Sequence, residues 1–421
     1  MMIPRRRLAL ASTVVLASAV ALAWAVRSGG RPEPTLEPIA RLASLGRFDA
    51  AEVALGELLR AYPHFDDAHL LEAQLKLDRP EPPTVQGQRP DPGPAAIALE
   101  HLAKVGPGDP KRDALVCLYR GKADYRLARL DAAEASWLDA LRINPTVPEA
   151  GWCLLEIYYL EGRSERARAL ALKLHEAEPD PRDRVQFLLE LLRQDAQPMA
   201  PDSAVQWFEA AAKQAPDDLH VAITLGLALT RTGQSDRGLE LLGRLAHDHP
   251  DQLDAWDAWL VGLDAAGEVE RLEEAFQERP TSMAKSPRFA RHEARLALER
   301  SDFRGAVSAY RRALSASPHD RVIEYQLARA LRLLGDLGEA ERIERDRREF
   351  LEANKEVRPL YEEANAIPNL GVVPRLDIYR RIADLRERMG FAQEALAWKR
   401  LILRHQTNDP SSVAAIARLG R

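Results

Sequence analysis

The histidines and their acidic neighbours are the side chains best suited to bind a metal or transfer a proton. The densest group is the run His247–His249, just before Pro250. A zinc site needs three or four ligands, so this run would need others from elsewhere in the chain. His175 and His292 are each followed by glutamate but lack the second histidine of the zinc-protease motif H-E-x-x-H. We therefore predict no catalytic residue, no metal site and no cofactor.

The two cysteines do not indicate redox or metal chemistry. Cys117 and Cys153 are 36 residues apart, and no C-x-x-C pair occurs. Free cysteine is often a small buried apolar residue. A disulfide remains an open alternative, although this spacing is not typical of a bridge. The sequence also lacks a phosphate-binding glycine loop and a serine elbow.

Arginine offers a more specific chemistry. Arg288, Arg291 and Arg295 follow i, i+3, i+7 spacing, which places them on one face of a helix. A guanidinium group binds a carboxylate through two parallel hydrogen bonds. Such a row suits an acidic or C-terminal peptide segment if the surrounding elements expose it.

Those elements are predicted by prolines at a fixed interval. Pro145 and Pro179 are 34 residues apart, as are Pro216 and Pro250, and Pro318 lies 68 residues after Pro250. A period of this size is typical of stacked helix–turn–helix units. Proline fits the end of each unit because it cannot continue a helix. The composition, 46% hydrophobic and 29% charged, fits a helical chain.

Small residues recur within these units. In each unit one lies on the first helix, a short polar turn follows, and another opens the second helix, so the two helices can approach closely. The first-helix residues are Gly121, Gly226, Ala294, Ala328 and Ala383, and those of the second helix are Ala133, Ala167, Ala306, Ala340 and Ala395. Leu155 and Leu260 depart from the pattern. A glycine such as Gly335 fits the end of the first helix because it adopts left-handed backbone angles.

This pattern resembles the tetratricopeptide repeat family. The strongest matches are Ser301–Phe303, Tyr310, Ala313 and Pro318 in one unit and Leu327, Leu331 and Gly335–Leu337 in the next. The resemblance covers most of residues 39–421. It implies an all-α superhelix, a solenoid whose first helices line a concave groove where peptides bind.

The resemblance places the arginine row in this groove. Adding the 34-residue period sets Tyr325 beside Arg291 and Arg329 beside Arg295. The candidate partner-binding residues are Arg288, Arg291, Arg295, Tyr325, Arg329, Arg332 and Trp152. The asparagines of the family's carboxylate-clamp subgroup are absent, so the resemblance does not imply clamp recognition.

Ion pairing within the solenoid is the alternative interpretation of the row. Subtracting 34 sets Asp254 beside Arg288 and Asp257 beside Arg291. Exposed pairs of this kind are common and add little stability. The other three arginines of the set have no acidic neighbour by the same arithmetic.

The N-terminus predicts a membrane anchor. Residues 1–7 form a basic region ending in Arg5–Arg7, and residues 8–26 form an uncharged apolar run of 19. A helix needs about 20 apolar residues to span a bilayer, and the preceding arginines favour a cytoplasmic N-terminus. The alternative is a signal peptide cleaved at Ala23–Ala25, although secretory apolar regions are usually about 7–15 residues long. Residues 27–38 read as a spacer.

Three segments depart from the repeat. Residues 78–94 form a proline-rich insertion between helices. Residues 354–374 are predicted to be irregular, with a short helix near Leu360 and then a loop. Residues 411–421 are predicted to form the capping helix that the end of a solenoid requires.

We therefore expect a non-enzymatic scaffold that binds a protein or peptide segment, with an acidic segment as one option. The repeat domain would be periplasmic or extracytoplasmic on an inner-membrane anchor, or secreted after cleavage. The net charge of −5 does not favour nucleic acid, and no small-molecule substrate is expected. The alternatives are an assembly or maturation factor in a membrane complex, as in cytochrome biogenesis, and an enzyme with an unrecognised site.

Overall fold

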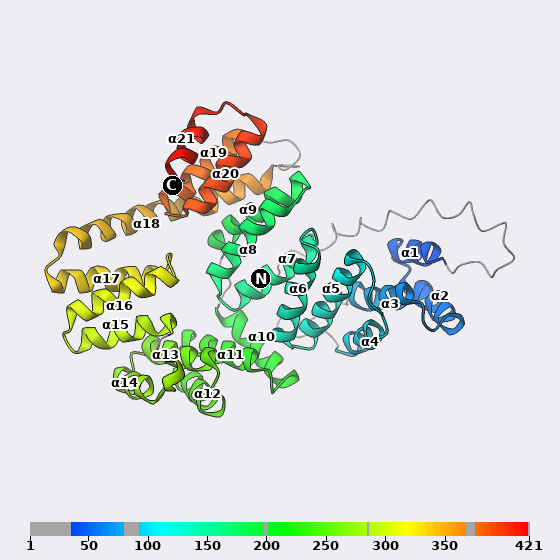
Figure 1. Cartoon of the computed structure of the whole chain (residues 1–421), viewed down its shortest axis with the longest axis horizontal. Coiled ribbons are helices and arrows are strands. Elements are labelled where there is room, and N and C mark those ends of the chain that lie inside the picture. The colour runs from blue at the N-terminus through cyan, green and yellow to red at the C-terminus, as the bar shows by residue number, and fades with distance from the viewer. Residues whose placement is uncertain (1–34, 80–91, 198–200, 284–285, 368–374, 420–421) are drawn as a thin grey trace. The chain divides into compact units, whose positions relative to one another are not determined.

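The described part of the chain is entirely helical (Figure 1). The computed structural model describes residues 35–79, 92–197, 201–283, 286–367 and 375–419. The predicted anchor at 8–26 and most of the insertion at 78–94 lie outside these residues. None of the helices within them is long and apolar enough to cross a bilayer.

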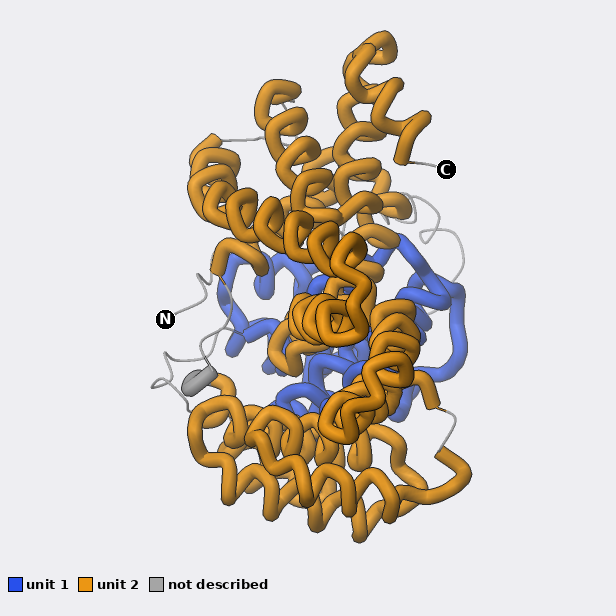
Figure 2. The backbone as a smooth tube through the Cα atoms, turned by 90° about the vertical axis from the view of Figure 1, so that its left-hand side faces the viewer, with its two compact units in different colours: residues 1–153 blue, residues 154–421 orange. Residues whose placement is uncertain are grey.

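The chain divides into two compact units, residues 1–153 and 154–421 (Figure 2). The helices of unit 1 are α1 (Glu37–Ser44), α2 (Phe48–Ala61), α3 (Asp66–Asp78), α4 (Gly93–Leu102), α5 (Pro110–Arg126) and α6 (Leu130–Ile143). Helix α7 (Pro148–Leu160) crosses the boundary. Cys117 and Cys153 in unit 1 are not joined by a disulfide.

Unit 2 continues the series of helical hairpins. Its helices are α8 (Ser164–Ala177), α9 (Pro181–Ala196), α10 (Pro201–Gln214), α11 (Leu219–Arg231), α12 (Ser235–Asp248), α13 (Leu253–Ala266), α14 (Val269–Glu278), α15 (Ala290–Glu299), α16 (Phe303–Ala316), α17 (Arg321–Leu334), α18 (Leu337–Ala366), α19 (Leu376–Arg388), α20 (Ala392–His405) and α21 (Pro410–Leu419). The predicted capping helix is α21. Two single-turn 3₁₀ helices, Thr281–Met283 and Pro287–Phe289, precede α15.

The turns inside the hairpins share one backbone conformation. Six glycines that follow first helices have positive φ: Gly46, Gly162, Gly233, Gly267, Gly335 and Gly390. Ala128 and Ser301 occupy the same turn position with φ of 62° and 60°. The left-handed conformation ends the first helix, as predicted. In these two hairpins the turn therefore has a positive φ although the residue is not glycine.

Small residues set the spacing between paired helices. A Cβ atom on Gly121 would lie 2.4 Å from Nε1 of the Trp137 indole, and one on Gly226 would lie 2.6 Å from Cγ of Leu242. The indole of Trp137 is only 2% exposed and donates to the Leu118 carbonyl at 3.0 Å. The prediction that these glycines allow close approach is confirmed.

Helix α18 differs from the prediction. It runs without interruption to Ala366, so residues 354–366 extend a helix that begins at Leu337. Its buried face continues through Val357, Leu360 and Ala364, and the helix packs against α9. This burial accounts for a helix that continues past Pro359, which would otherwise favour a break.

Unit 2 closes on its own first helices. Besides the α9–α18 contact, α20 contacts both α8 and α9. Four charged side chains join these helices. Arg168 on α8 pairs with Asp195 on α9 at 2.6 Å and with Glu394 on α20, and Arg386 on α19 pairs with the same two acids at 2.5 and 3.1 Å. The Arg386 side chain is fully buried and Glu394 is 3% exposed. We call these four residues the closure network.

Three further contacts support the closure. His319, just before α17, contacts Glu165 on α8 at 3.0 Å. Arg321 on α17 donates to the Met389 carbonyl, which follows α19, at 2.7 Å. The guanidinium of Arg168 also lies 3.9 Å from the ring centre of Phe391. Segments about 150 residues or more apart in the chain are therefore tied together by polar contacts as well as by packing.

The turn geometry predicts opposite effects at two equivalent positions. Ser301→Gly should stabilise the chain by about 1 kcal/mol, because glycine adopts positive φ without a Cβ penalty. Gly335→Ala should destabilise it by about 1 kcal/mol, although an added Cβ would meet no atom within 4 Å. Urea unfolding of both variants measures this. If both variants changed the free energy of unfolding by the same amount and in the same direction, the effect would not come from the backbone conformation of the turn.

The closure network predicts an effect that spans unit 2. Arg386→Met leaves two buried acids short of a countercharge and should cost about 3–5 kcal/mol. Amide exchange should rise in α8 and α9 as well as in α19 and α20. The control is Arg388→Met, which breaks the half-exposed pair with Glu356 and should cost no more than about 1 kcal/mol. Faster exchange confined to α19 and α20 would show that the network does not carry the closure.

Candidate binding surface

Helix α17 exposes one continuous stripe of side chains. Asp320 caps the helix by accepting from the backbone N–H groups of Val322 and Ile323 at 3.0 and 3.1 Å. The buried face comprises Ile323, Leu327, Ala328, Ala330 and Leu331. The other face carries Val322, Tyr325, Arg329 and Leu333, spaced i, i+3, i+7 and i+11. Val322, Tyr325 and Leu333 are 60%, 48% and 49% exposed, and Arg329 is also exposed. We call these four residues the α17 stripe.

Helix α18 borders the α17 stripe on one side. The Arg347 guanidinium lies 5.0 Å from the ring centre of Tyr325. Leu351, one turn further along the same face of α18, is 54% exposed. The surface next to Tyr325 therefore combines an aromatic ring with aliphatic side chains, which is the composition of a protein-binding patch.

Most of the arginine row is neutralised. Arg288 pairs with both Asp254 and Asp257. Arg291 lies 4.0 Å from Asp264 and 3.6 Å from Asp320. The ion-pair interpretation is therefore confirmed for Arg288, whereas the partner expected for Arg291, Asp257, is instead bound by Arg288.

Two arginines expected to lack acidic neighbours have them. Arg295 pairs with Asp264 at 3.5 Å and also with Glu299. Arg332 makes a two-pronged contact with Glu344 on α18, at 2.7 and 2.5 Å. Adding or subtracting the 34-residue period does not find these acids. Glu299 is one turn from Arg295 on the same helix, and Glu344 lies across the α17–α18 hairpin from Arg332. Within the described residues, Arg329 is the one arginine of the predicted set without an ion pair.

Buried Tyr310 on α16 lies near three of the arginines and near Asp264. Burial raises the pKa of its hydroxyl, and the nearby charges of Arg295, Arg291 and Arg329 act in the opposite direction. Arg291, Arg295 and Arg329 therefore all lie close enough to Tyr310 to affect its pKa. Trp152 lies on α7 in unit 1 and is half-buried, and its role in binding stays a prediction.

The tryptophans and His247 belong to the core and its edge. Trp137, Trp256, Trp259 and Trp398 are 2%, 3%, 8% and 1% exposed, which confirms core packing for these four. The His247 ring packs 5.0 Å from the Trp259 ring. No group of three metal-binding side chains occurs among the residues that the structure describes.

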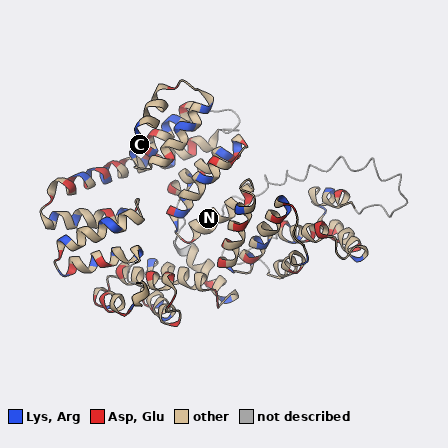
Figure 3. Ribbon diagram, viewed as in Figure 1, with Lys and Arg blue, Asp and Glu red and all other residues tan. Residues whose placement is uncertain are grey.

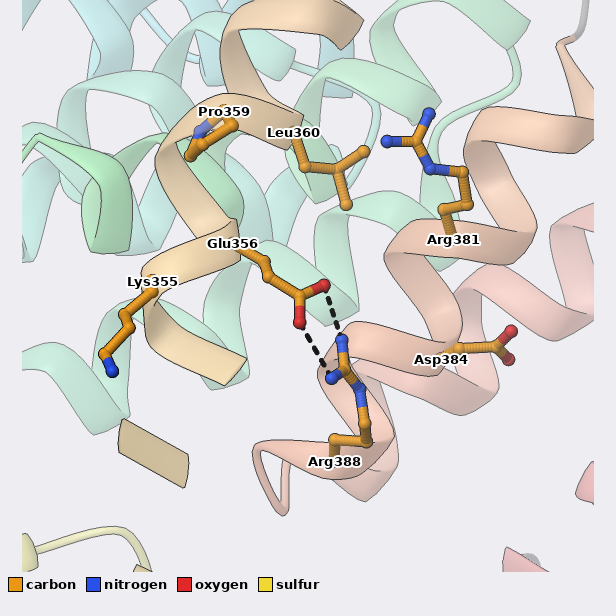
Figure 4. Close-up of a pocket in the computed structure, with 7 residues that line it drawn as sticks. All are labelled: Lys355, Glu356, Pro359, Leu360, Arg381, Asp384 and Arg388. Atoms are coloured by element: carbon orange, nitrogen blue, oxygen red, sulfur yellow. Dashed lines mark hydrogen bonds and ion pairs between the residues drawn. The ribbon is translucent and has the colours of Figure 1, made fainter. Parts of the chain in front are cut away.

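Basic and acidic residues are interspersed along the helices of both units (Figure 3). A hollow between α18 and α19 shows the same balance (Figure 4). Its Arg388 pairs with Glu356 at 2.9 and 2.7 Å, and its Arg381 pairs with Glu363 at 2.7 Å. This hollow therefore offers little unsatisfied charge to a ligand.

Residues 297–343 match the tetratricopeptide repeat family model. The matched stretch begins within α15, includes α16 and α17 and ends within α18. It contains the whole α17 stripe, and the predicted repeat is confirmed there. A fold of this type is that of a protein-interaction scaffold.

No curated protein matches the chain. Among solved structures, it is similar to a tetratricopeptide repeat protein from Parabacteroides merdae, with 13% identity, coverage of 74% of this chain and 100% of that one, and a TM-score of 0.29. It is also similar to the anaphase-promoting complex hetero-tetramer Cut9–Hcn1, with 13% identity, coverage of 90% of this chain and 74% of that one, and a TM-score of 0.34. A third similar structure is the human IFIT1 dimer with PPP-AAAA, with 16% identity, coverage of 84% of this chain and 85% of that one, and a TM-score of 0.34. Similarity at this level says nothing about the partner of this chain.

Proposed function

We propose that this protein is a non-enzymatic scaffold that binds a segment of a partner protein on the α17 stripe. The observation that carries the proposal is the stripe itself. It exposes three large apolar or aromatic side chains and one arginine without an ion pair, beside arginines that already have acidic partners. Exposed apolar side chains gathered on one face mark interaction sites more often than scattered ones do.

The stripe defines the chemistry of the partner segment. Val322 and Leu333 are 11 residues apart, which is about 16 Å along a helix, or roughly five residues of extended chain. Apolar side chains of the segment would contact Val322, Tyr325 and Leu333. A single carboxylate would pair with Arg329. A mainly apolar segment with one acidic residue fits this surface better than a strongly acidic one, because the neighbouring arginines are neutralised.

We also propose that residues 8–26 hold the scaffold in the inner membrane, with the repeats on its outer side. The length of the apolar run and the three arginines before it support this topology. A scaffold placed there would hold its partner at the membrane surface.

The stripe hypothesis is tested by photo-crosslinking from position 325 in cells, followed by affinity measurements with the purified crosslinked partner. The triple variant Val322→Ser, Tyr325→Ser, Arg329→Glu should weaken binding at least tenfold, because it removes two apolar contacts and reverses the charge. It should fold normally, since these side chains are exposed. The control is Val413→Ser on α21, where valine is 51% exposed. Unchanged affinity in the triple variant would exclude the stripe.

The topology has a separate test. The mature protein should keep residues 8–26, remain in the membrane after alkaline carbonate extraction, and lose its repeats to protease added from outside the inner membrane. Edman sequencing that starts at Val26 would instead show cleavage after Ala25. Protection of the repeats from external protease would contradict the proposed side of the membrane.

A further inference from the structure

Two histidines of unit 1 meet between α3 and α4, which pack directly on each other (Figure 1). The Nδ1 atoms of His69 on α3 and His101 on α4 lie 3.0 Å apart, and the centres of the two rings are 5.1 Å apart. His69 is only 4% exposed and His101 is half-buried. Two titratable rings therefore share one hydrogen bond inside a helix pair.

The hydrogen bonds determine which nitrogen atoms carry hydrogen. Nε2 of His69 lies 2.9 Å from the Pro63 carbonyl oxygen, which can only accept, so this nitrogen is a donor. In the neutral ring, Nδ1 of His69 is then an acceptor, and the hydrogen between the two rings belongs to His101. A proton added to His69 must therefore go to its Nδ1 atom, where it turns the acceptor into a donor and breaks the bond between the rings.

The surroundings of the pair disfavour a positive charge on His101. Burial lowers the pKa of His101 to about 4, and the charges of His69, Lys104 and Lys76 act in the same direction. Glu100, on the same helix as His101, acts in the opposite direction. The neutral pair is therefore the state that fits the packed helices.

The charges on the neighbouring helices are already paired. Glu72 of α3 lies close enough to His69 for the two to interact. Lys76 pairs with Glu72 at 3.4 Å and with Glu52 of α2 at 3.2 Å. Arg112 of α5 faces the acids in the first turn of α3. A second positive charge on the histidine pair would therefore meet acids that already have cations beside them.

We propose that the His69–His101 pair is an acid-sensitive latch between α3 and α4. At neutral pH the hydrogen bond between the rings holds the two helices together. In acid, protonation of both rings removes this bond and sets two like charges side by side, so α4 separates from α3. Ala95, Ala98 and Leu102 form the buried face of α4, and opening uncovers part of it. The latch does not depend on the scaffold function, because it uses no residue of the α17 stripe.

The pKa of His101 gives the direction of the pH effect. In the opened helix pair His101 regains its ordinary pKa of 6.5, whereas the closed pair holds it at about 4. The closed form therefore binds fewer protons. It is favoured above pH 6.5 and loses stability relative to the opened form as the pH falls from 6.5 towards 4. Uptake of this one proton raises the opening equilibrium constant roughly 70-fold between pH 7.5 and pH 4.5.

Hydrogen exchange of the full-length protein between pH 7.5 and pH 4.5 tests the latch, because exchange detects rare local openings. Each measured rate is divided by the intrinsic exchange rate at the same pH. We expect the protection of the α4 amides to fall roughly 70-fold in the parent, as the linkage requires, and less than about threefold in His101→Asn. Asparagine places an amide donor where Nδ1 of His101 lies and takes up no proton, so this variant should fold.

Two further variants separate the charge from other effects of acid. His64→Asn, which replaces an exposed histidine just before α3, should lose protection like the parent. His101→Arg carries a permanent charge and should reduce the protection of α4 already at pH 7.5, with little further change in acid.

Three results would overturn the latch. The first is a protection of α4 that does not change with pH, or that falls equally in His101→Asn. The second is an equal loss of protection in every helix of unit 1, which would show general unfolding in acid. The third is parental protection of α4 at pH 7.5 in His101→Arg, because a charge at this position would then not open the pair.

Discussion

The closure network is the interaction on which the arrangement of unit 2 depends. Arg168, Asp195, Arg386 and Glu394 carry two positive and two negative charges from four helices into a region that water scarcely reaches. Buried charges are tolerated when they are paired, and losing one partner leaves an uncompensated charge. An ordinary solenoid makes contacts between neighbouring repeats alone. Here the first and last hairpins of the unit also hold each other.

This closure constrains every helix between its ends. The hairpins from α10 to α17 follow α9 and lead into α18, while α9 contacts both α18 and α20. Their curvature is therefore limited at both ends, which restricts the freedom of an open repeat array. The α17 stripe belongs to this constrained stretch. Less rigid positions would cost a bound ligand more ordering entropy.

Local features of unit 2 follow from the sequence, whereas contacts at long range do not. The 34-residue period predicted the hairpins and their turns, because each unit repeats the same local geometry; Ser301 even keeps the turn without glycine. For the predicted surface, the repeat placed Arg329 beside Arg295, and this placement stays a prediction. The repeat missed Asp264, because that acid is not at an equivalent position. In the closure network, Arg386 lies 191 positions from Asp195 and Arg168 lies 226 positions from Glu394. A single sequence contains no pattern that pairs residues so far apart.

The pairing of arginines distinguishes the α17 stripe from the surface beside it. Like charges gathered on adjacent helices repel one another, so a folded chain lowers its energy by placing acids between them. The structure does this for Arg288, Arg291 and Arg295. Arg329, by contrast, has no ion pair among the described residues, and it shares a helix face with the exposed Val322, Tyr325 and Leu333. Because Arg329 is exposed, its charge is hydrated and costs the folded chain little, and it is available to pair with a carboxylate of a partner segment.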